Sequence, residues 1–192
     1  MSQTIRSFIA IELPQAVGSL LGKVQQDLRA LRLRAGWVRP QNIHLTLKFL
    51  GDIKTDDIDK IGPAMKAAAE EFEPFNLSIG GIGFFPGIKR PRVIWVGVGG
   101  QTRNLFALQR SLEDRLAAVD FPKEKRSFKG HLTLGRFRDA ADPDTIRRVI
   151  QEYSDFGKVE FTVQRVVLLQ SDLKPSGAVY SQLLQADLRN EY

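Results

Sequence analysis

The segment His-Leu-Thr-Leu occurs twice in the chain, beginning at His44 and at His131, and it contains both histidines of the 192 residues. Each copy lies in an apolar run that is typical of a β-strand, in which side chains alternate between two faces. His44 therefore shares a face with Thr46, and His131 shares one with Thr133, while the leucines of both copies point the opposite way. The repeat predicts two similar half-modules that place two imidazole–hydroxyl pairs across one cleft, with the leucines in the core.

The spacing of apolar residues predicts helices and strands that are intermixed along the chain. No glycine-rich phosphate loop follows a predicted strand, which disfavours a nucleotide-binding doubly wound sheet. The sequence instead favours an α+β fold with antiparallel sheets. Strands are predicted at 7–13, 43–50, 75–82, 93–98, 131–137, 161–169 and 179–188, helices at 15–33, 55–68, 105–119 and 143–150, and a loop with a basic end at 80–92.

Composition narrows the class of protein. The hydrophobic content of 43% and the charged content of 26% are ordinary for a soluble globular protein, and 192 residues are enough for one substantial core. The absence of cysteine excludes disulfides and thiolate chemistry. No apolar run reaches the roughly 18 residues of a membrane helix, and the first residues lack a signal-type stretch, so a cytoplasmic protein is expected. The net charge of +6 is compatible with a partner that carries phosphates.

Several roles are open to the two histidines. A structural role is the ordinary one for a single histidine on a strand, but it does not explain why both copies carry the same three-residue tail. A zinc site is disfavoured because the chain has no cysteine and no acidic residue stands two or four positions after either histidine. A Ser-His-Asp triad needs only one histidine, and the paired carboxylates of a glycosidase need none.

Concerted acid–base chemistry on a phosphate uses both pairs. Histidine titrates near neutral pH, so one ring can be neutral while the other is protonated. The neutral ring would remove a proton from the attacking oxygen, and the protonated ring would donate one to the leaving oxygen. The threonine hydroxyls would donate hydrogen bonds to the phosphoryl oxygens, and two facing half-modules would put base and acid on opposite sides of phosphorus. Such a site is expected to need no metal ion and no cofactor.

The chain resembles the 2H phosphoesterase superfamily, which is named for two His-x-Thr/Ser-x motifs, and within it the RNA 2′,3′-cyclic phosphodiesterases, historically called 2′-5′ RNA ligases. The resemblance runs almost from end to end. One departure is Gly130, where the family usually has proline just before the second histidine, and a change in local rigidity is expected there. The segments that carry the resemblance are 6–14, 37–51, 83–86, 91–97, 128–136 and 171–180.

The resemblance implies a bilobal, pseudo-twofold α+β fold, with an antiparallel sheet in each lobe, helices outside and a central cleft. Residues 1–192 would form a single domain of this kind, with one motif in each lobe. The implied reaction is hydrolysis of a terminal RNA 2′,3′-cyclic phosphate to a 2′-phosphomonoester. The resemblance assigns proton donation to His44 and proton acceptance to His131. It assigns phosphate binding to Thr46 and Thr133. Because the motifs are so alike, the sequence does not fix which histidine is the acid and which is the base.

The partner implied by the resemblance is RNA or an oligonucleotide with a 2′,3′-cyclic phosphate end. A monomer that does not bind a membrane is expected. Two other functions stay open at this level. Joining of RNA ends through a 2′-5′ linkage would use the same residues, by microscopic reversibility. A non-catalytic RNA-binding module would use the basic segments 89–92 and 123–129.

Two further cations lie just beyond the motifs. Lys48 shares the strand parity of His44 and is predicted either to contact a phosphate or to lie at a solvated rim. Arg136 has the parity of the core face unless Gly135 marks a β-bulge that re-aims it. The resemblance favours Arg136 as a substrate contact, and a buried ion pair is the alternative.

Overall fold

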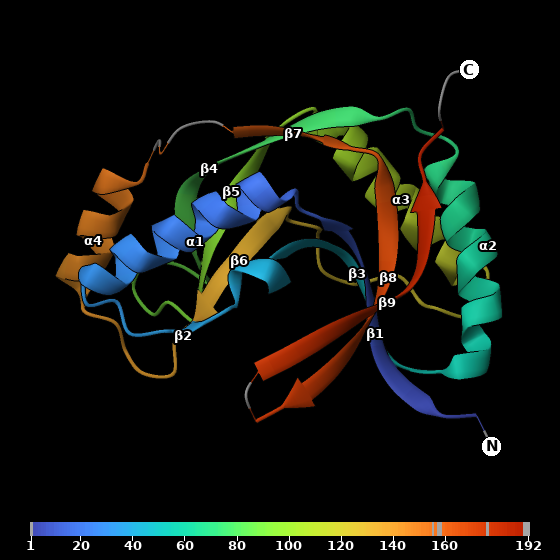
Figure 1. Cartoon of the computed structure of the whole chain (residues 1–192), viewed down its shortest axis with the longest axis horizontal. Helices are drawn as coiled ribbons and strands as arrows, with labels where there is room; N and C mark the ends of the chain where they lie inside the picture. The colour runs from blue at the N-terminus through green and yellow to red at the C-terminus, as the bar shows by residue number, and fades with distance from the viewer. Residues whose placement is uncertain (1, 155, 157–158, 176, 190–192) are drawn as a thin grey trace.

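The structure is a computed structural model that describes residues 2–154, 156, 159–175 and 177–189 (Figure 1). The strands are β1 (Thr4–Glu12), β2 (Gly36–Trp37), β3 (His44–Lys54), β4 (Phe75–Phe85), β5 (Val93–Gly100), β6 (His131–Arg136), β7 (Val159–Val163), β8 (Arg165–Lys174) and β9 (Gly177–Asp187). The helices are α1 (Gln15–Ala30), α2 (Ile58–Ala69), α3 (Thr102–Ala117) and α4 (Pro143–Glu152), with two short 3-10 turns, η1 (Pro40–Asn42) and η2 (Thr55–Asp57).

The described strands form one nine-stranded antiparallel sheet whose order is symmetrical about its centre. The order is β7-β4-β5-β6-β3-β1-β8-β9, and β2 pairs with β6 off this path. The central strands β6 and β3 are joined by one Cα pair, Leu45 with Leu132. The expected α+β fold with two lobes is therefore confirmed, and the two predicted sheets are the two halves of one sheet.

Helices cover each half of the sheet because each helix has an apolar stripe. Figure 1 shows α1 and α4 on the half that contains β4, β5 and β6, and α2 and α3 on the half that contains β1, β8 and β9. In α1 the buried residues include Leu21 and Leu28, which pack into the same core as Leu45 and Leu132 of the motifs. The leucines next to the histidines thus point into the core, as predicted, and the histidines point the other way.

A β-bulge lies at the last leucine of each His-Leu-Thr-Leu segment. In the pairing of β3 with β1 the register skips Leu47, and in the pairing of β6 with β5 it skips Leu134. An extra residue in one strand reverses the alternation of side chains beyond it. The bulge considered for β6 is confirmed, and the equivalent bulge in β3 was not predicted.

The bulges decide which side chains beyond the motifs reach the exposed face. Lys48 and Gly135, the first residues after the motifs, are both buried. The next residues, Phe49 and Arg136, are exposed, and Phe49 is 62% exposed. The same local distortion thus places an aromatic ring beyond one motif and a guanidinium beyond the other.

Two predicted segments are wrong. The glycine-rich part of the predicted loop 80–92 is the second half of β4. Its glycines permit close packing rather than a turn, because a Cβ on Gly83 would lie 2.1 Å from the ring of Trp95. The predicted strand 161–169 is two strands, β7 paired with β4 and β8 paired with β1. The chain changes partners at Gln164, where no glycine or proline marks the break.

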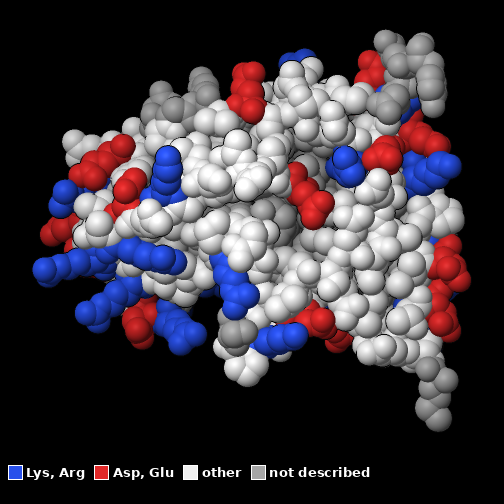
Figure 2. Space-filling model, viewed as in Figure 1, with Lys and Arg blue, Asp and Glu red and all other residues white. Residues whose placement is uncertain are grey.

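The surface is charged unevenly. In the view of Figure 2, lysines and arginines gather on the half of the molecule that contains α4 and β2. No helix in the described ranges is long and apolar enough to span a membrane.

Candidate active site

The pairing of β3 with β6 brings the two motifs together. Leu45 and Leu132 are the Cα partners that join these strands, and both are fully buried. In an antiparallel pair, the residues on either side of two partners also oppose each other, with their side chains on the other face. The residues that flank the two leucines therefore meet on the face opposite the core.

Those flanking residues form what we call the His–Thr rectangle: His44, Thr46, His131 and Thr133. The antiparallel register sets His44 opposite Thr133 and sets Thr46 opposite His131. All four are half-buried. The two imidazoles occupy one diagonal of the rectangle, and the two hydroxyls occupy the other.

Backbone and aromatic contacts fix the ring of His44. Its Nδ1 lies 2.7 Å from the backbone oxygen of Asn42, so Nδ1 carries the proton that it donates, and Nε2 is left for a substrate. The ring stacks on Phe8 at 4.6 Å between centroids and meets the edge of Tyr180 at 5.2 Å. Asn42 is itself held, because its Nδ2 donates to the backbone oxygen of Ala178 at 2.7 Å. Strand β9 thus supports both the ring and its carbonyl partner.

The ring of His131 is held in the same way. Its Nδ1 lies 2.6 Å from the backbone oxygen of Lys129, again two residues before the histidine. Phe85 meets the ring edge-on at 4.9 Å and stacks on Trp95, also at 4.9 Å. The two histidines therefore share one tautomer, in which Nδ1 donates to the backbone and Nε2 is left to meet a ligand.

Burial lowers the pKa of His44 below its ordinary value of 6.5, because the desolvated ring between Phe8 and Tyr180 disfavours a positive charge. The hydrogen bond to Asn42 opposes this effect, and the charge of His131 lowers the pKa further. The last cause means that the two rings lie within electrostatic range of each other. In the free protein at pH 7, His44 is therefore mostly neutral.

Arg136 continues the exposed face of β6 beyond Thr133. Burial raises the pKa of the Tyr180 hydroxyl, and the charges of Arg136 and Arg6 oppose this rise. Both guanidinium groups thus lie within electrostatic range of the ring that packs on His44. The buried ion pair considered for Arg136 is wrong, because the bulge exposes this residue. Its contact with a substrate stays a prediction.

Comparison with known proteins decides the family. Residues 20–175 match the family described as the 2′-5′ RNA ligase superfamily. The chain belongs to this superfamily.

Two relatives of this superfamily member are similar to it over nearly their whole length. A Thermus thermophilus protein named RNA 2′,3′-cyclic phosphodiesterase is 35% identical over 196 residues, which span 98% of this chain and 92% of the relative. A Thermotoga maritima protein of the same name is 32% identical over 181 residues, 94% of each chain. The crystal structure of a Thermus thermophilus protein superposes with a TM-score of 0.77 at 30% identity, over 98% of this chain and 100% of that one.

Lys48 of this 2′-5′ RNA ligase superfamily member occupies neither of its predicted positions. It is 4% exposed and lies on the helix-covered face. Its Nζ is 2.5 Å from Oε2 of Glu113 and donates to the backbone oxygen of Pro122 at 2.8 Å. The predictions of a phosphate contact and of a solvated rim are both wrong, because the bulge at Leu47 turns the side chain to the core.

Several residues around the site were not identified by the spacing of the motifs. They include the rings that pack against the histidines, and they come from strands far apart in the sequence, so no periodicity links them. The sequence contained one indication of these residues, because all of them lie in or beside the segments that resemble the family. The residues are Phe8 of β1, Asn42 of η1, Phe85 of β4, Trp95 of β5 and Tyr180 of β9.

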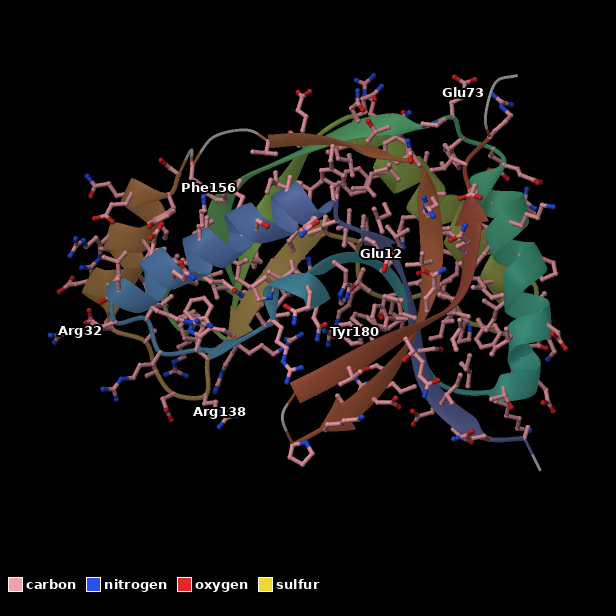
Figure 3. All side chains as sticks on the ribbon, viewed as in Figure 1. Glu12, Arg32, Glu73, Arg138, Phe156 and Tyr180 are labelled. Atoms are coloured by element: carbon pink, nitrogen blue, oxygen red, sulfur yellow. The ribbon has the colours of Figure 1, made fainter. Side chains whose placement is uncertain are left out.

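A cavity of about 670 Å³ adjoins His44, between the first turns of α1, the η1 turn and β9. Figure 3 labels Glu12 and Tyr180, which line it. In the described ranges of the chain, no group of three or more His, Asp or Glu side chains is placed to hold a metal ion.

The backbone conformation at position 130 does not require glycine, because Gly130 does not have a positive φ. A Cβ at this position would, however, lie 3.2 Å from Cδ2 of Leu105. The main chain next to His131 is thus anchored by the Lys129 carbonyl contact rather than by a proline.

Proposed function

We propose that this chain hydrolyses the terminal 2′,3′-cyclic phosphate of RNA to a 2′-phosphomonoester. The observation that carries the proposal is the pairing of Leu45 with Leu132, which puts two imidazoles and two hydroxyls on the diagonals of one rectangle. Relatives at 35% and 32% identity carry the name of this activity. Since each half of the sheet contributes one motif, residues 1–192 act as a single catalytic domain.

The diagonal arrangement suits in-line displacement at phosphorus. Nε2 of His131 accepts a proton from water as the water oxygen attacks phosphorus. The bond from phosphorus to the ribose O3′ breaks, and Nε2 of His44 donates its proton to O3′, while the phosphate stays on O2′. The hydroxyls of Thr46 and Thr133 donate hydrogen bonds to the non-bridging oxygens, where negative charge develops in the transition state.

Bound phosphate supplies the proton-donor form of His44. Burial keeps this ring neutral in the free protein, but an anion in contact with it favours the charged form and raises its pKa. By linkage, the protonated ring binds the anion more tightly. Affinity for an anion therefore increases as pH falls through the pKa of His44 in the complex, and it levels off below the pKa of the free protein.

We expect an NMR titration to place the pKa of His44 below 6.5 in the free protein and to move it upward when sulfate is added. Sulfate keeps its charge across this range, so the shift reports the histidine rather than the ligand. A Thr46→Val, Thr133→Val variant is the control, in which the shift should shrink because the anion loses its hydroxyl donors. A pKa of His44 that stays unchanged in sulfate-saturated protein would remove this residue from the role of proton donor.

Hydrolysis should be unaffected by excess EDTA, because two histidines and two hydroxyls supply every step. The assay uses an oligonucleotide with a 2′,3′-cyclic phosphate end, with phosphorus NMR to identify the product. A 2′-phosphomonoester is expected, and the same mixture with an added 5′-hydroxyl RNA measures any 2′-5′ joining. A 3′-phosphate product, or an activity that EDTA abolishes and a divalent cation restores, would contradict the mechanism.

A further inference from the structure

We propose that phosphates upstream of the RNA end bind a second site at the far end of β6, the arginine site, formed by Arg34 and Arg138. This inference rests on the proposed function, since it names the part of the substrate that lies outside the His–Thr rectangle. Both arginines are exposed and line one cavity of about 350 Å³ beside β2. Figure 3 labels Arg138 close to β2, on the half of the molecule that contains α4.

The segments that leave the pairing of β2 with β6 bring the two arginines to one cavity. Gly36 is the Cα partner of Arg136, and Arg34 and Arg138, each two residues beyond this pair, line the same cavity. β6 ends at Arg136, but the alternation of exposure continues just beyond it, because Phe137 is buried and Arg138 is exposed. Two residues of extended chain span at most about 7 Å, which is the scale of the distance between neighbouring phosphates in an extended strand. Thr133, Arg136 and the arginine site thus follow one another toward the end of β6 and just beyond it.

The arginine site has two cationic side chains and one acidic side chain, which leaves an excess of positive charge. In the described part of the chain, no ion pair joins Arg34, Arg136 or Arg138 to an acid, although Asp139 lines the same cavity. Two guanidinium groups that line one cavity repel each other. A phosphate between the two guanidinium groups would remove this repulsion and form charge-assisted hydrogen bonds with both. Figure 2 shows that the basic side chains gather on this half of the molecule.

The position of the site favours the RNA strand itself over a separate anion. The cyclic phosphate occupies the His–Thr rectangle, and Arg136 is the next cation on the same face of the same strand. An oligonucleotide that extends past Arg136 therefore reaches the arginine site just beyond the end of β6, whereas a mononucleotide cannot reach both. The inferred substrate is a strand with at least two phosphates upstream of its cyclic end.

The test compares two substrates in an Arg34→Gln, Arg138→Gln variant. For a single-stranded oligonucleotide with a cyclic phosphate end, we expect KM to rise on the order of tenfold with little change in kcat, because upstream phosphates position the strand. The slope of log affinity against log salt should decrease by about 1.4, since each lost contact with a single strand contributes about 0.7. For a 2′,3′-cyclic mononucleotide, KM and kcat should stay close to those of the parent protein. The matched control is Arg103→Gln, Arg110→Gln, which removes two exposed arginines of α3 and should leave both substrates unaffected.

Binding separates this inference from the proposed function. Fluorescence anisotropy with an oligonucleotide that ends in a 2′-phosphate measures the arginine site without turnover. If the parent protein binds this oligonucleotide and the Arg34→Gln, Arg138→Gln variant binds it more weakly, the arginine site is supported, even if the parent protein hydrolyses neither substrate. If the parent protein hydrolyses both substrates and the variant matches it in KM and salt slope, the arginine site is wrong and the proposed function stands.

Discussion

Replacing either His44 or His131 by alanine should lower kcat/KM for the cyclic phosphate by about 10²–10⁴-fold, the usual loss when one general acid or base is removed. Both rings present Nε2 on one diagonal of the His–Thr rectangle, so neither can substitute for the other. The double variant should be little worse than the worse single variant, because groups that act in one concerted step are not additive. Initial rates with an oligonucleotide substrate, together with a thermal melt of each variant, measure the effect.

A substrate with a better leaving group separates the two histidine roles. In a 3′-deoxynucleoside 2′-(4-nitrophenyl phosphate), nitrophenolate replaces O3′ and departs without a proton. His44→Gln should regain much of its activity on this substrate, whereas His131→Gln should not, since water must still be deprotonated. The opposite pattern would exchange the acid and the base. Full activity of both single variants on the cyclic phosphate would refute two-histidine catalysis.

Breaking the buried ion pair of Lys48 with Glu113 should lower the free energy of unfolding by about 3–5 kcal/mol, because the remaining charge stays buried without its partner. The two side chains are only 3% and 9% exposed. Glu113 also accepts a hydrogen bond from the backbone nitrogen of Glu124 at 3.1 Å, so the pair joins β3 and α3 to the segment that precedes β6. For a chain of this size, Lys48→Met should lower Tm by about 6–20 °C, measured by calorimetry.

A double variant shows whether charge or packing causes the loss. Lys48→Met with Glu113→Gln removes both charges and keeps an acceptor for the Glu124 nitrogen, so it should be more stable than either single variant. Lys66→Met is the surface control, since Lys66 and Glu70 are 72% and 56% exposed and such a pair contributes about 0.3–0.5 kcal/mol. A loss in Lys48→Met as small as in this control would mean that the ion pair does not stabilise the fold.

The four residues of the His–Thr rectangle could be predicted from the sequence because the alternation of a strand is a local property. Two side chains that are two residues apart in a regular strand lie on the same face, whichever strand it pairs with. The same logic gave the core leucines and the apolar stripes of the helices. It was wrong for Lys48, and it left Arg136 open, because a bulge arises from pairing with a neighbouring strand and has no fixed signature of its own. The glycine at position 135 indicated a possible bulge in β6, whereas no residue near Leu47 indicated the bulge in β3.

By itself, the sequence determined which residue types would carry the proposed chemistry and which way they point along their own strands. Only the tertiary structure decided that Leu45 pairs with Leu132, and hence that the imidazoles lie on one diagonal, because this contact joins strands from opposite halves of the chain. It also decided that His44 is desolvated between Phe8 and Tyr180, which lowers its pKa. Pairing partners and burial depend on contacts between distant segments, and no local pattern of residues encodes them.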